Sequence, residues 1–433
     1  MRIALLALVS LAAACSSYPG PDLGYGANPQ LAAPHGGMFP TINTARAIGW
    51  AQGAGPTAPE GYAVTRYAEG LDHPRWLYVL PNGDVLVAQS STRATRGGGI
   101  VGWIGNSMQR RAGAIEDQSP DRITLLRDSN ADGIVDETHV FAEGLNQPFG
   151  MALVGGHLFI ANTDAVLRFA YAEGQTRLEG AGEAILDLPY HEAANGHWTR
   201  SLAVSPDGSK LYVAVGSVSN VPESADALAL EEGRAAVWEF NPDGSEARLY
   251  ATGLRNPVGM EFEPHSGALW VAVNERDMLG DNLVPDYMTS VEDGAFYGWP
   301  YYYFGTHRDE RVEIPANVRL REPLSPDYAL GSHTASLGLH FYSAEALGPA
   351  YQGGVFIGQH GSWNRSQRVG YKVVFVPFAN GRPNGEVQDF LTGFLNTRGE
   401  AQGRPVGVIT DRTGALLVAD DVGDIIWRVS PLR

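Results

Sequence analysis

One unit recurs along the chain: a short polar segment, here called the lead, is followed by an apolar stretch, a turn and a second apolar stretch. Six of the second stretches are continuous in hydrophobicity and fall at 85–88, 158–161, 211–214, 269–272, 355–358 and 416–419. Turns such as Asn82-Gly83 and Asp207-Gly208 supply the positive φ angles that tight hairpins need. Such runs are typical of strands that are buried on both faces.

The polar leads mark six repeats of one unit. They occupy 73–76, 147–150, 198–201, 256–259, 335–338 and 404–407. Their spacing of roughly 50 to 80 residues leaves room for four strands and a variable loop in each unit. The pattern predicts an all-β fold, a six-bladed β-propeller. The uneven spacing leaves a seventh blade or an open β-sandwich as alternatives.

Composition agrees with this fold and excludes one class of partner. The 433 residues include 53 glycines and 27 prolines, which suits many short strands joined by turns. The formal net charge of -17 argues against nucleic-acid binding, which needs clustered lysine and arginine.

The first residues have the pattern of a signal peptide. Arg2 precedes an apolar run over 3–11 and three alanines, and Cys15, the only cysteine, follows directly. This resembles a bacterial lipobox, in which the cysteine becomes the acylated N-terminus. We therefore expect a lipoprotein signal peptide over 1–14, a flexible tether over 15–55 and the propeller over 56–433. The alternative is an ordinary secretory signal with an incidental cysteine.

Ser16 after the cysteine favours the periplasmic side of the outer membrane, with the lipid anchor as the only membrane contact. Neither the charge nor the repeats distinguish a monomer from a homodimer.

In a propeller, the leads and the loops after the second strands meet at one mouth of the central channel. The leads bring His73, Arg75, Gln147, His197, Arg200, Arg255, Asn256, His333 and Arg404 to this face. The loops bring Gln89, Asn162, Asn274, Glu275, Arg276, His360, Trp363, Arg365, Asp420 and Asp421. Each side chain alone could be structural, but several arginines around one axis repel one another unless an anion joins them. A ligand with several carboxylates is indicated.

Several stretches at these positions resemble one known family. They are Asn195-Gly196-His197, Gly253-Leu254-Arg255-Asn256-Pro257, Tyr297-Gly298-Trp299-Pro300, His360-Gly361-Ser362-Trp363-Asn364-Arg365 and Arg404-Pro405-Val406. From about Gly70 to the C-terminus the chain resembles the pyrroloquinoline quinone (PQQ)-dependent soluble glucose and sorbosone dehydrogenases, which are six-bladed propellers.

The resemblance implies roles for individual residues. His197 takes the position of the general base, and Arg255 and Asn256 take that of an Arg-Asn pair that contacts cofactor and substrate. Arg365 and Arg404 match basic residues that bind cofactor oxygens, and we expect Asn274, His333 and His360 to line the same cofactor site. Hydride would pass from the substrate to PQQ.

The resemblance also implies an active-site Ca²⁺, held by backbone carbonyls after the second strand of the fourth blade. Here these are the carbonyls of Glu275 and Arg276. The segment 274–277 departs from the Gly-Pro of soluble glucose enzymes. The stretch 360–365 is closer to the sorbosone and broader aldose-dehydrogenase branch.

A separate loop over 128–136 follows the Asp-x-Asn-x-Asp-Gly pattern of calcium-binding loops. The predicted ligands of a structural Ca²⁺ are Asp128, Asn130, Asp132, Ile134 through its carbonyl, and Asp136. His139 stands where such loops end in glutamate, and the stretches on both sides read as strands. A metal-free turn built by the same side chains is the alternative.

The sequence therefore predicts a PQQ- and Ca²⁺-dependent dehydrogenase that oxidises an aldose or related sugar aldehyde to a lactone or acid. Electrons would leave to a periplasmic cytochrome or a quinone, since the chain has no Cys-x-x-Cys-His haem-attachment motif. Two alternatives remain: a calcium-dependent sugar-lactone hydrolase and a non-catalytic binding propeller.

Overall fold

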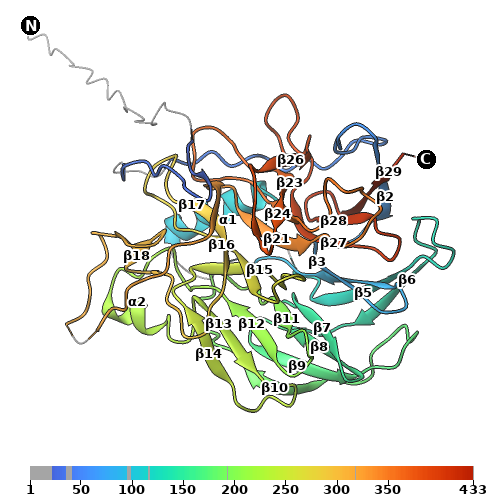
Figure 1. The fold of residues 1–433 in the computed structure, drawn as a ribbon, viewed down its shortest axis with the longest axis horizontal. Coiled ribbons are helices and arrows are strands. Elements are labelled where there is room, and N and C mark those ends of the chain that lie inside the picture. Colours follow the sequence, from blue (N-terminus) through green and yellow to red (C-terminus); the bar gives the residue numbers. More distant parts are fainter. Residues whose placement is uncertain are drawn as a thin grey trace, which may run out of the picture.

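Six four-stranded antiparallel blades surround a central axis in the computed structural model, which describes residues 22–35, 41–94, 99–115, 118–192, 194–316 and 318–432 (Figure 1). The predicted six-bladed propeller is confirmed. Each predicted lead precedes or begins an innermost strand, and each second stretch forms the next strand of the same blade.

The first three blades follow chain order from the axis outward. Blade 1 contains β3 (Pro74–Val79), β4 (Val85–Gln89), β5 (Arg122–Arg127) and β6 (Glu137–Ala142). Blade 2 contains β7 (Met151–Val154), β8 (His157–Ala161), β9 (Ala165–Ala170) and β10 (Glu183–Asp187). Blade 3 contains β11 (Leu202–Val204), β12 (Leu211–Val215), β13 (Ala236–Phe240) and β14 (Arg248–Thr252).

Of the last three blades, blades 4 and 6 also use a distant part of the chain. Blade 4 contains β15 (Asn256–Phe262), β16 (Leu269–Asn274), β17 (Pro285–Ser290) and β20 (Tyr328–Ser332), and β1 (Tyr25–Gly26) adds a fifth strand at its edge. Blade 5 contains β21 (Ser336–Phe341), β22 (Val355–Gln359), β23 (Lys372–Val376) and β26 (Gln388–Leu391). Blade 6 joins β27 (Pro405–Thr410), β28 (Leu416–Asp420) and β29 (Ile425–Pro431) to β2 (Tyr62–Glu69). Figure 1 shows β2 beside β29, so strands from both ends of the chain close the ring.

The other elements lie in loops. Helix α1 (Gly99–Arg111) is inserted between β4 and β5, and α2 (Ala225–Ala229) follows β12. Two short hairpins are formed by β18 (Tyr302–Tyr303) with β19 (His307–Arg308), and by β24 (Phe378–Ala379) with β25 (Arg382–Pro383). Among the described residues, no helix is both long and apolar enough to cross a membrane.

Glycines in the leads let neighbouring innermost strands approach closely. A Cβ on Gly259 would lie 2.5 Å from the carbonyl oxygen of Leu337 in the next blade. One on Gly338 would lie 2.2 Å from that of Val406. The recurring glycine is therefore explained by backbone contact between blades.

An apolar cluster fills the axis. Phe149, Trp198, Val258, Leu337 and Val406 pack together with Trp76, so every blade contributes one side chain. The rings of Trp76 and Phe149 lie 4.8 Å apart between centroids. Polar residues of the leads therefore lie over an apolar floor.

The segment expected to be a tether is packed against the propeller over much of its length. Residues 22–35 and 41–55, here called the N-terminal strap, contact blades 4, 5 and 6. Trp50 packs edge-on against Phe394 and Trp427, and its indole Nε1 donates to Asp420 at 2.7 Å. The described structure thus begins well before residue 56. The predicted signal peptide and Cys15 lie outside the described residues.

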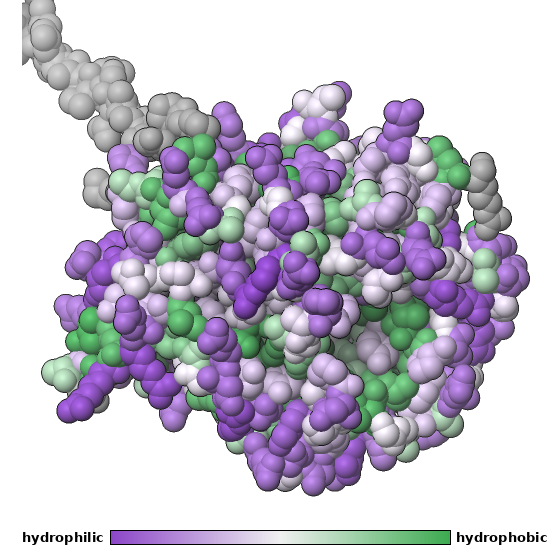
Figure 2. All heavy atoms as spheres, in the orientation of Figure 1, coloured by the Kyte–Doolittle hydropathy of each residue, from purple (hydrophilic) through white to green (hydrophobic). Residues whose placement is uncertain are grey.

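Hydrophilic residues cover most of the face shown in Figure 2, and hydrophobic residues appear there as separate patches. This agrees with the strongly negative net charge.

Candidate active site

A cavity of about 460 Å³ lies at the mouth of the channel. Its polar wall comes from the leads and the loops of the blades: His197, Arg255, Asn256, Asn274, Glu275, Asp277, Asp286, His333, His360 and Arg404. The rest of the wall comes from α1 and the residues after it, the N-terminal strap and the loops of blade 5: Ile42, Thr44, Gly105, Met108, Gln109, Ala112, Ala114, Ala335, Gly361 and Trp363. The structure therefore brings together most of the predicted catalytic and cofactor-binding residues.

His197 precedes β11 and presents one ring nitrogen to the cavity. Its Nδ1 lies 2.8 Å from the carbonyl oxygen of Ser217 and 3.0 Å from the Ser217 hydroxyl. Because a carbonyl only accepts, Nδ1 carries the proton of the neutral ring and Nε2 carries the lone pair. Burial, with the nearby Arg255 cation adding to it, lowers the pKa of His197 to about 3. The side chain is therefore a neutral proton acceptor at physiological pH.

Of the two arginines in the described cavity wall, Arg404 is the one without a compensating carboxylate. It is 4% exposed, and among the described residues it forms no ion pair. Its guanidinium donates to the carbonyls of His360 and Ala45 at long distances of 3.3 and 3.4 Å, and its Nε has no partner. It also lies over the ring of Tyr371, 4.8 Å from the centroid. A buried guanidinium so weakly bound is suited to receive an anion.

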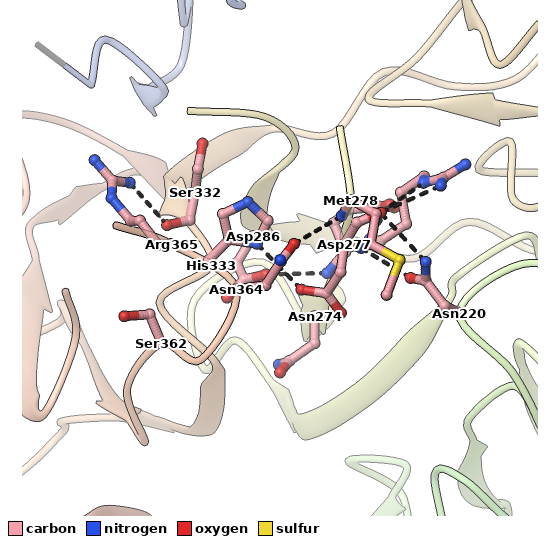
Figure 3. A network of polar contacts seen from close by, with 12 residues as sticks. Asn220, Asn274, Asp277, Met278, Asp286, Ser332, His333, Ser362, Asn364 and Arg365 are labelled. Carbon is pink, nitrogen blue, oxygen red and sulfur yellow. Dashed lines mark hydrogen bonds and ion pairs between the residues drawn. The ribbon is translucent and has the colours of Figure 1, made fainter. Parts of the chain in front are cut away.

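Arg255, by contrast, is fully engaged by blade 4 and the loop after β12. It donates to the Glu275 carbonyl at 2.7 Å and to the Asn220 side chain at 3.1 Å, and it lies 3.5 Å from the Asp277 carboxylate. Asp277 also lies 3.1 Å from Nδ1 of His333. Burial lowers the pKa of His333, but the Asp277 carboxylate outweighs it and raises the pKa above its ordinary value. Figure 3 shows His333 and Asp277 in this network, in which Arg255 has a carboxylate partner.

Asn256 and Asn274 lie side by side, paired across β15 and β16. The side-chain oxygen of Asn256 is buried and has no hydrogen-bond partner. Asn274 donates through its amide to the Ser336 carbonyl. A Cβ on Gly216 would lie 2.4 Å from the Asn256 oxygen and 2.6 Å from the Cβ of His197. Only glycine at 216 therefore leaves room for both side chains.

The carbonyls predicted to hold an active-site Ca²⁺ lie beside this network. The carbonyl of Glu275 accepts from Arg255, and the side chain of Arg276 forms a buried ion pair with Asp309. Burial raises the pKa of the Glu275 carboxyl to about 7. Among the described residues, no three His, Cys, Asp or Glu side chains gather as a metal site.

Arg365 does not contribute to the cavity wall. It donates to Asp22 of the N-terminal strap at 2.8 Å, to the Ser332 carbonyl at 3.1 Å and to Asn282 at 2.8 Å. In Figure 3 its guanidinium turns toward Ser332, away from Asp277 and Asn274. The arginine of the His-Gly-Ser-Trp-Asn-Arg stretch thus fastens the strap to blade 5.

Other side chains predicted at this face lie outside the cavity wall: His73, Arg75, Gln89, Gln147, Asn162, Arg200, Arg276, Asp420 and Asp421. Arg200 holds the backbone of His197, because it donates to the carbonyl of His197 at 2.9 Å. Asp420 anchors Trp50 and Trp427 through one carboxylate oxygen.

The structure adds lining residues that the sequence reasoning missed. Asp286, on β17, accepts from the backbone N–H groups of Glu275 and Ser336 and thereby holds two loops of the cavity. No repeat position marks it, because it lies on a third strand. Ile42 and Met108 come from segments outside the repeats, and their sequence carries no signal for the cavity.

The predicted calcium loop is a hairpin connection between β5 and β6, as expected. Asp128 accepts from the N–H of Gly133 at 2.8 Å, and Asn130 accepts from that of Asp132 at 2.8 Å. The side chains thus order the turn through backbone N–H groups, and the structural Ca²⁺ stays a prediction. The loop also docks on blade 6, because Arg412 donates to the Asp128 carbonyl at 2.6 Å.

Comparison with known proteins identifies the family of the chain. The profile of the family described as glucose/sorbosone dehydrogenase matches residues 158–364, which span blades 2 to 5. A TrAA12-like profile matches residues 320–431. An uncharacterised protein of Borreliella burgdorferi is 30% identical over 304 residues, covering 67% of this chain and 77% of its own.

The chain belongs to the glucose/sorbosone dehydrogenase family. Two solved structures share the fold of this family member. A calcium structure of a carbohydrate-active enzyme of family AA12 from Trichoderma reesei has a TM-score of 0.67 at 19% identity, covering 91% of this chain and 100% of its own. The holo PQQ domain of a pyranose dehydrogenase from Coprinopsis cinerea has a TM-score of 0.65 at 19% identity, covering 90% and 100%.

Proposed function

We propose that this protein is a PQQ-dependent dehydrogenase that oxidises an aldose or a related sugar aldehyde to the lactone or acid. The observation that carries the proposal is Arg404, a buried cation in the cavity wall that lacks a carboxylate partner. Family membership and the PQQ domain of the similar pyranose dehydrogenase support the choice of cofactor.

The cavity residues fit a cofactor that bears several carboxylates and carbonyls. Arg404 offers a guanidinium to a carboxylate, and bidentate binding of this kind is strong. The unpartnered oxygen of Asn256 can accept from a ring N–H. Arg255, Asn274, His333 and His360 would complete the cofactor contacts. PQQ, when bound, supplies a two-electron acceptor for hydride.

The protein's own part is to hold the substrate and to move its proton. Nε2 of His197 is the proton acceptor, because Nδ1 is committed to Ser217. Its low pKa keeps the lone pair available, so the ring would take the proton of the substrate hydroxyl while the carbon that bears this hydroxyl gives up hydride. Arg255, 5% exposed and beside His197, favours the neutral imidazole before the reaction.

The backbone oxygen expected to bind an active-site Ca²⁺ already accepts a hydrogen bond. The Glu275 carbonyl that would bind Ca²⁺ accepts a hydrogen bond from Arg255, so the residues as arranged do not present a ready calcium site. The oxygen has a second lone pair, but a Ca²⁺ ion bound there would lie beside the Arg255 guanidinium, whose charge opposes its binding.

A sugar and an electron acceptor are the proposed partners, the acceptor being a periplasmic cytochrome or a quinone. We also propose that Cys15 is acylated and anchors the chain to the periplasmic side of the outer membrane. Incorporation of labelled fatty acid into the wild-type protein but not into Cys15→Ser checks this anchor; equal labelling of both would exclude it.

Reconstitution tests the function directly. Purified ligand-free protein is mixed with PQQ, with and without Ca²⁺, and reduction of an artificial dye is followed with a panel of aldoses. We expect substrate-dependent dye reduction only when PQQ is present, together with a change in the quinone absorption on binding. The absence of dye reduction with every aldose, together with an unchanged quinone spectrum, would overturn the proposal.

A further inference from the structure

A buried carboxylate lies directly behind one of the cavity histidines. Asp421, which follows β28, is 2% exposed, and its Oδ2 lies 2.8 Å from Nε2 of His360. The same oxygen forms a close ion pair with Arg75 and lies 3.6 Å from Nε2 of His73. His360 is thus the only one of these partners that also lines the cavity.

The contact fixes the tautomer of His360. Burial raises the pKa of Asp421, but attraction to His360, Arg75 and His73 outweighs it and holds the carboxyl ionised. An ionised carboxylate only accepts hydrogen bonds, so Nε2 of His360 must donate. Burial lowers the pKa of His360 and keeps the ring neutral, although Asp421 opposes this shift. The lone pair of the neutral ring is then on Nδ1.

His360 and His197 both line the cavity, and the structure leaves a different ring nitrogen of each without a hydrogen bond to the described residues. His197 is held at Nδ1 by Ser217, and His360 is held at Nε2 by Asp421. Nδ1 of His360 forms no hydrogen bond with the described residues, and its side chain is 14% exposed. The charged groups around His360 are Asp421, Arg75, His73 and Arg404, the last donating to its backbone carbonyl.

We propose that Asp421 is a positioning residue that fixes His360 as a second proton acceptor of the cavity, with Nδ1 turned toward the bound ligand. The use of this acceptor rests on the proposed function. Oxidation of one hydroxyl to a carbonyl, with electrons passed on to two one-electron acceptors, releases two electrons and two protons. His197 takes the hydroxyl proton, and His360 takes the second proton as the reduced cofactor loses its electrons. The ionised Asp421 stabilises the imidazolium that forms.

The tautomer can be measured without cofactor or activity. In ligand-free protein labelled with ¹⁵N-histidine, the NMR correlations of His360 are identified by their loss in His360→Gln. We expect the wild-type ring to carry its proton on Nε2 alone at neutral pH. A proton on Nδ1, or rapid exchange between the two nitrogens, would overturn the proposal whatever the variants do.

Two substitutions distinguish the effect of the Asp421 hydrogen-bond acceptor on His360 from the effect of its negative charge. Asp421→Asn keeps an oxygen that accepts from Nε2, so we expect the wild-type tautomer. Asp421→Ala removes this acceptor, so a mixture of tautomers is expected. Glu261→Gln is the matched control, because Glu261 lies 3.1 Å from Nδ1 of His340, and neither residue lines the cavity. Unchanged His360 signals in a folded Asp421→Ala protein would contradict the positioning role.

The role in turnover is tested in the two half-reactions with PQQ-loaded protein. Asp421→Asn is expected to slow cofactor reoxidation by a one-electron acceptor about 100-fold, with cofactor reduction by the sugar within twofold of the wild type. Slower reduction with unchanged reoxidation would overturn the role of His360 as second acceptor. If no aldose reduces the cofactor in the wild type, the proposed function is wrong. The NMR measurement still tests the positioning of His360 by Asp421, because it uses ligand-free protein.

Discussion

Nδ1 of His197 lies 2.8 Å from the backbone carbonyl oxygen of Ser217. A backbone carbonyl cannot be removed by substitution and has no proton to give, so the orientation and tautomer of this imidazole are set by the path of the chain after β12. The free nitrogen is consequently a proton acceptor at the wall of a cavity that also holds an unpaired arginine.

Replacing His197 by glutamine should separate proton transfer from cofactor binding. Removal of a general base is expected to lower kcat by about 10²- to 10⁴-fold, because glutamine cannot take the hydroxyl proton. The affinity for PQQ should stay within about threefold of the wild type, since Arg404 is untouched. Stopped-flow reduction and quinone titration measure the two quantities, and an equal loss of both would assign His197 to cofactor binding instead.

The lowered pKa of His197 also predicts a pH-dependent stability. The buried ring has a pKa of about 3, whereas an imidazole in the unfolded chain has about 6.5. Between these values the unfolded chain binds a proton that the folded protein does not, so the free energy of unfolding rises with pH.

His197→Gln removes this contribution. From pH 7 to pH 5 the wild type should lose about 2 kcal/mol more than the variant, as measured by urea unfolding at both values. His73, whose pKa burial lowers to about 4, destabilises both proteins equally and cancels in the comparison. Parallel curves for the two proteins would mean that His197 is accessible to protons in the folded state.

Arg404→Gln should weaken cofactor binding. Loss of a charge-assisted hydrogen bond of about 1.5–3 kcal/mol predicts an affinity for PQQ that is about 10- to 100-fold lower. The ligand-free variant should be at least as stable as the wild type, because an uncompensated buried charge has been removed. Fluorescence titration with PQQ and thermal unfolding give both values.

Arg177→Gln serves as control for this variant, since Arg177 lies outside the cavity and pairs with the exposed Glu143. Its affinity for PQQ should equal that of the wild type. Unchanged affinity in Arg404→Gln would remove the observation on which the proposed function rests.

Trp50 should stabilise the propeller, although it lies in the segment that the composition marks as a tether. Trp50→Ala removes ring contacts with Phe394 and Trp427 and the hydrogen bond to Asp420, so a loss of about 2–3 kcal/mol in unfolding free energy is expected. Trp50→Phe keeps most of the ring contacts and should lose only about 1 kcal/mol. Denaturant unfolding measures both, and wild-type stability in Trp50→Ala would show that the strap contributes nothing.

The sequence by itself determined the repeat and hence the fold. Continuous apolar stretches and their turns are local signals, and six matched repeats of them favour neighbouring blades that bury both faces of each sheet. The leads and the loops after the second strands also indicated many of the side chains that meet at the mouth, because position in a repeat fixes position in a propeller. His197, Asn256, Asn274, His360 and Arg404 were found in this way.

Only the tertiary structure decided which charges are paired. Arg255, Arg365 and Arg404 look alike in the sequence, but Asp277 and Asp22 compensate the first two, and Arg404 is left without a carboxylate. The strap, α1 and Asp286 also line the cavity, although none of them lies at a repeat position that the sequence marks. Pairing depends on contacts between residues that are hundreds of positions apart, such as Asp22 with Arg365, and no local pattern records such contacts.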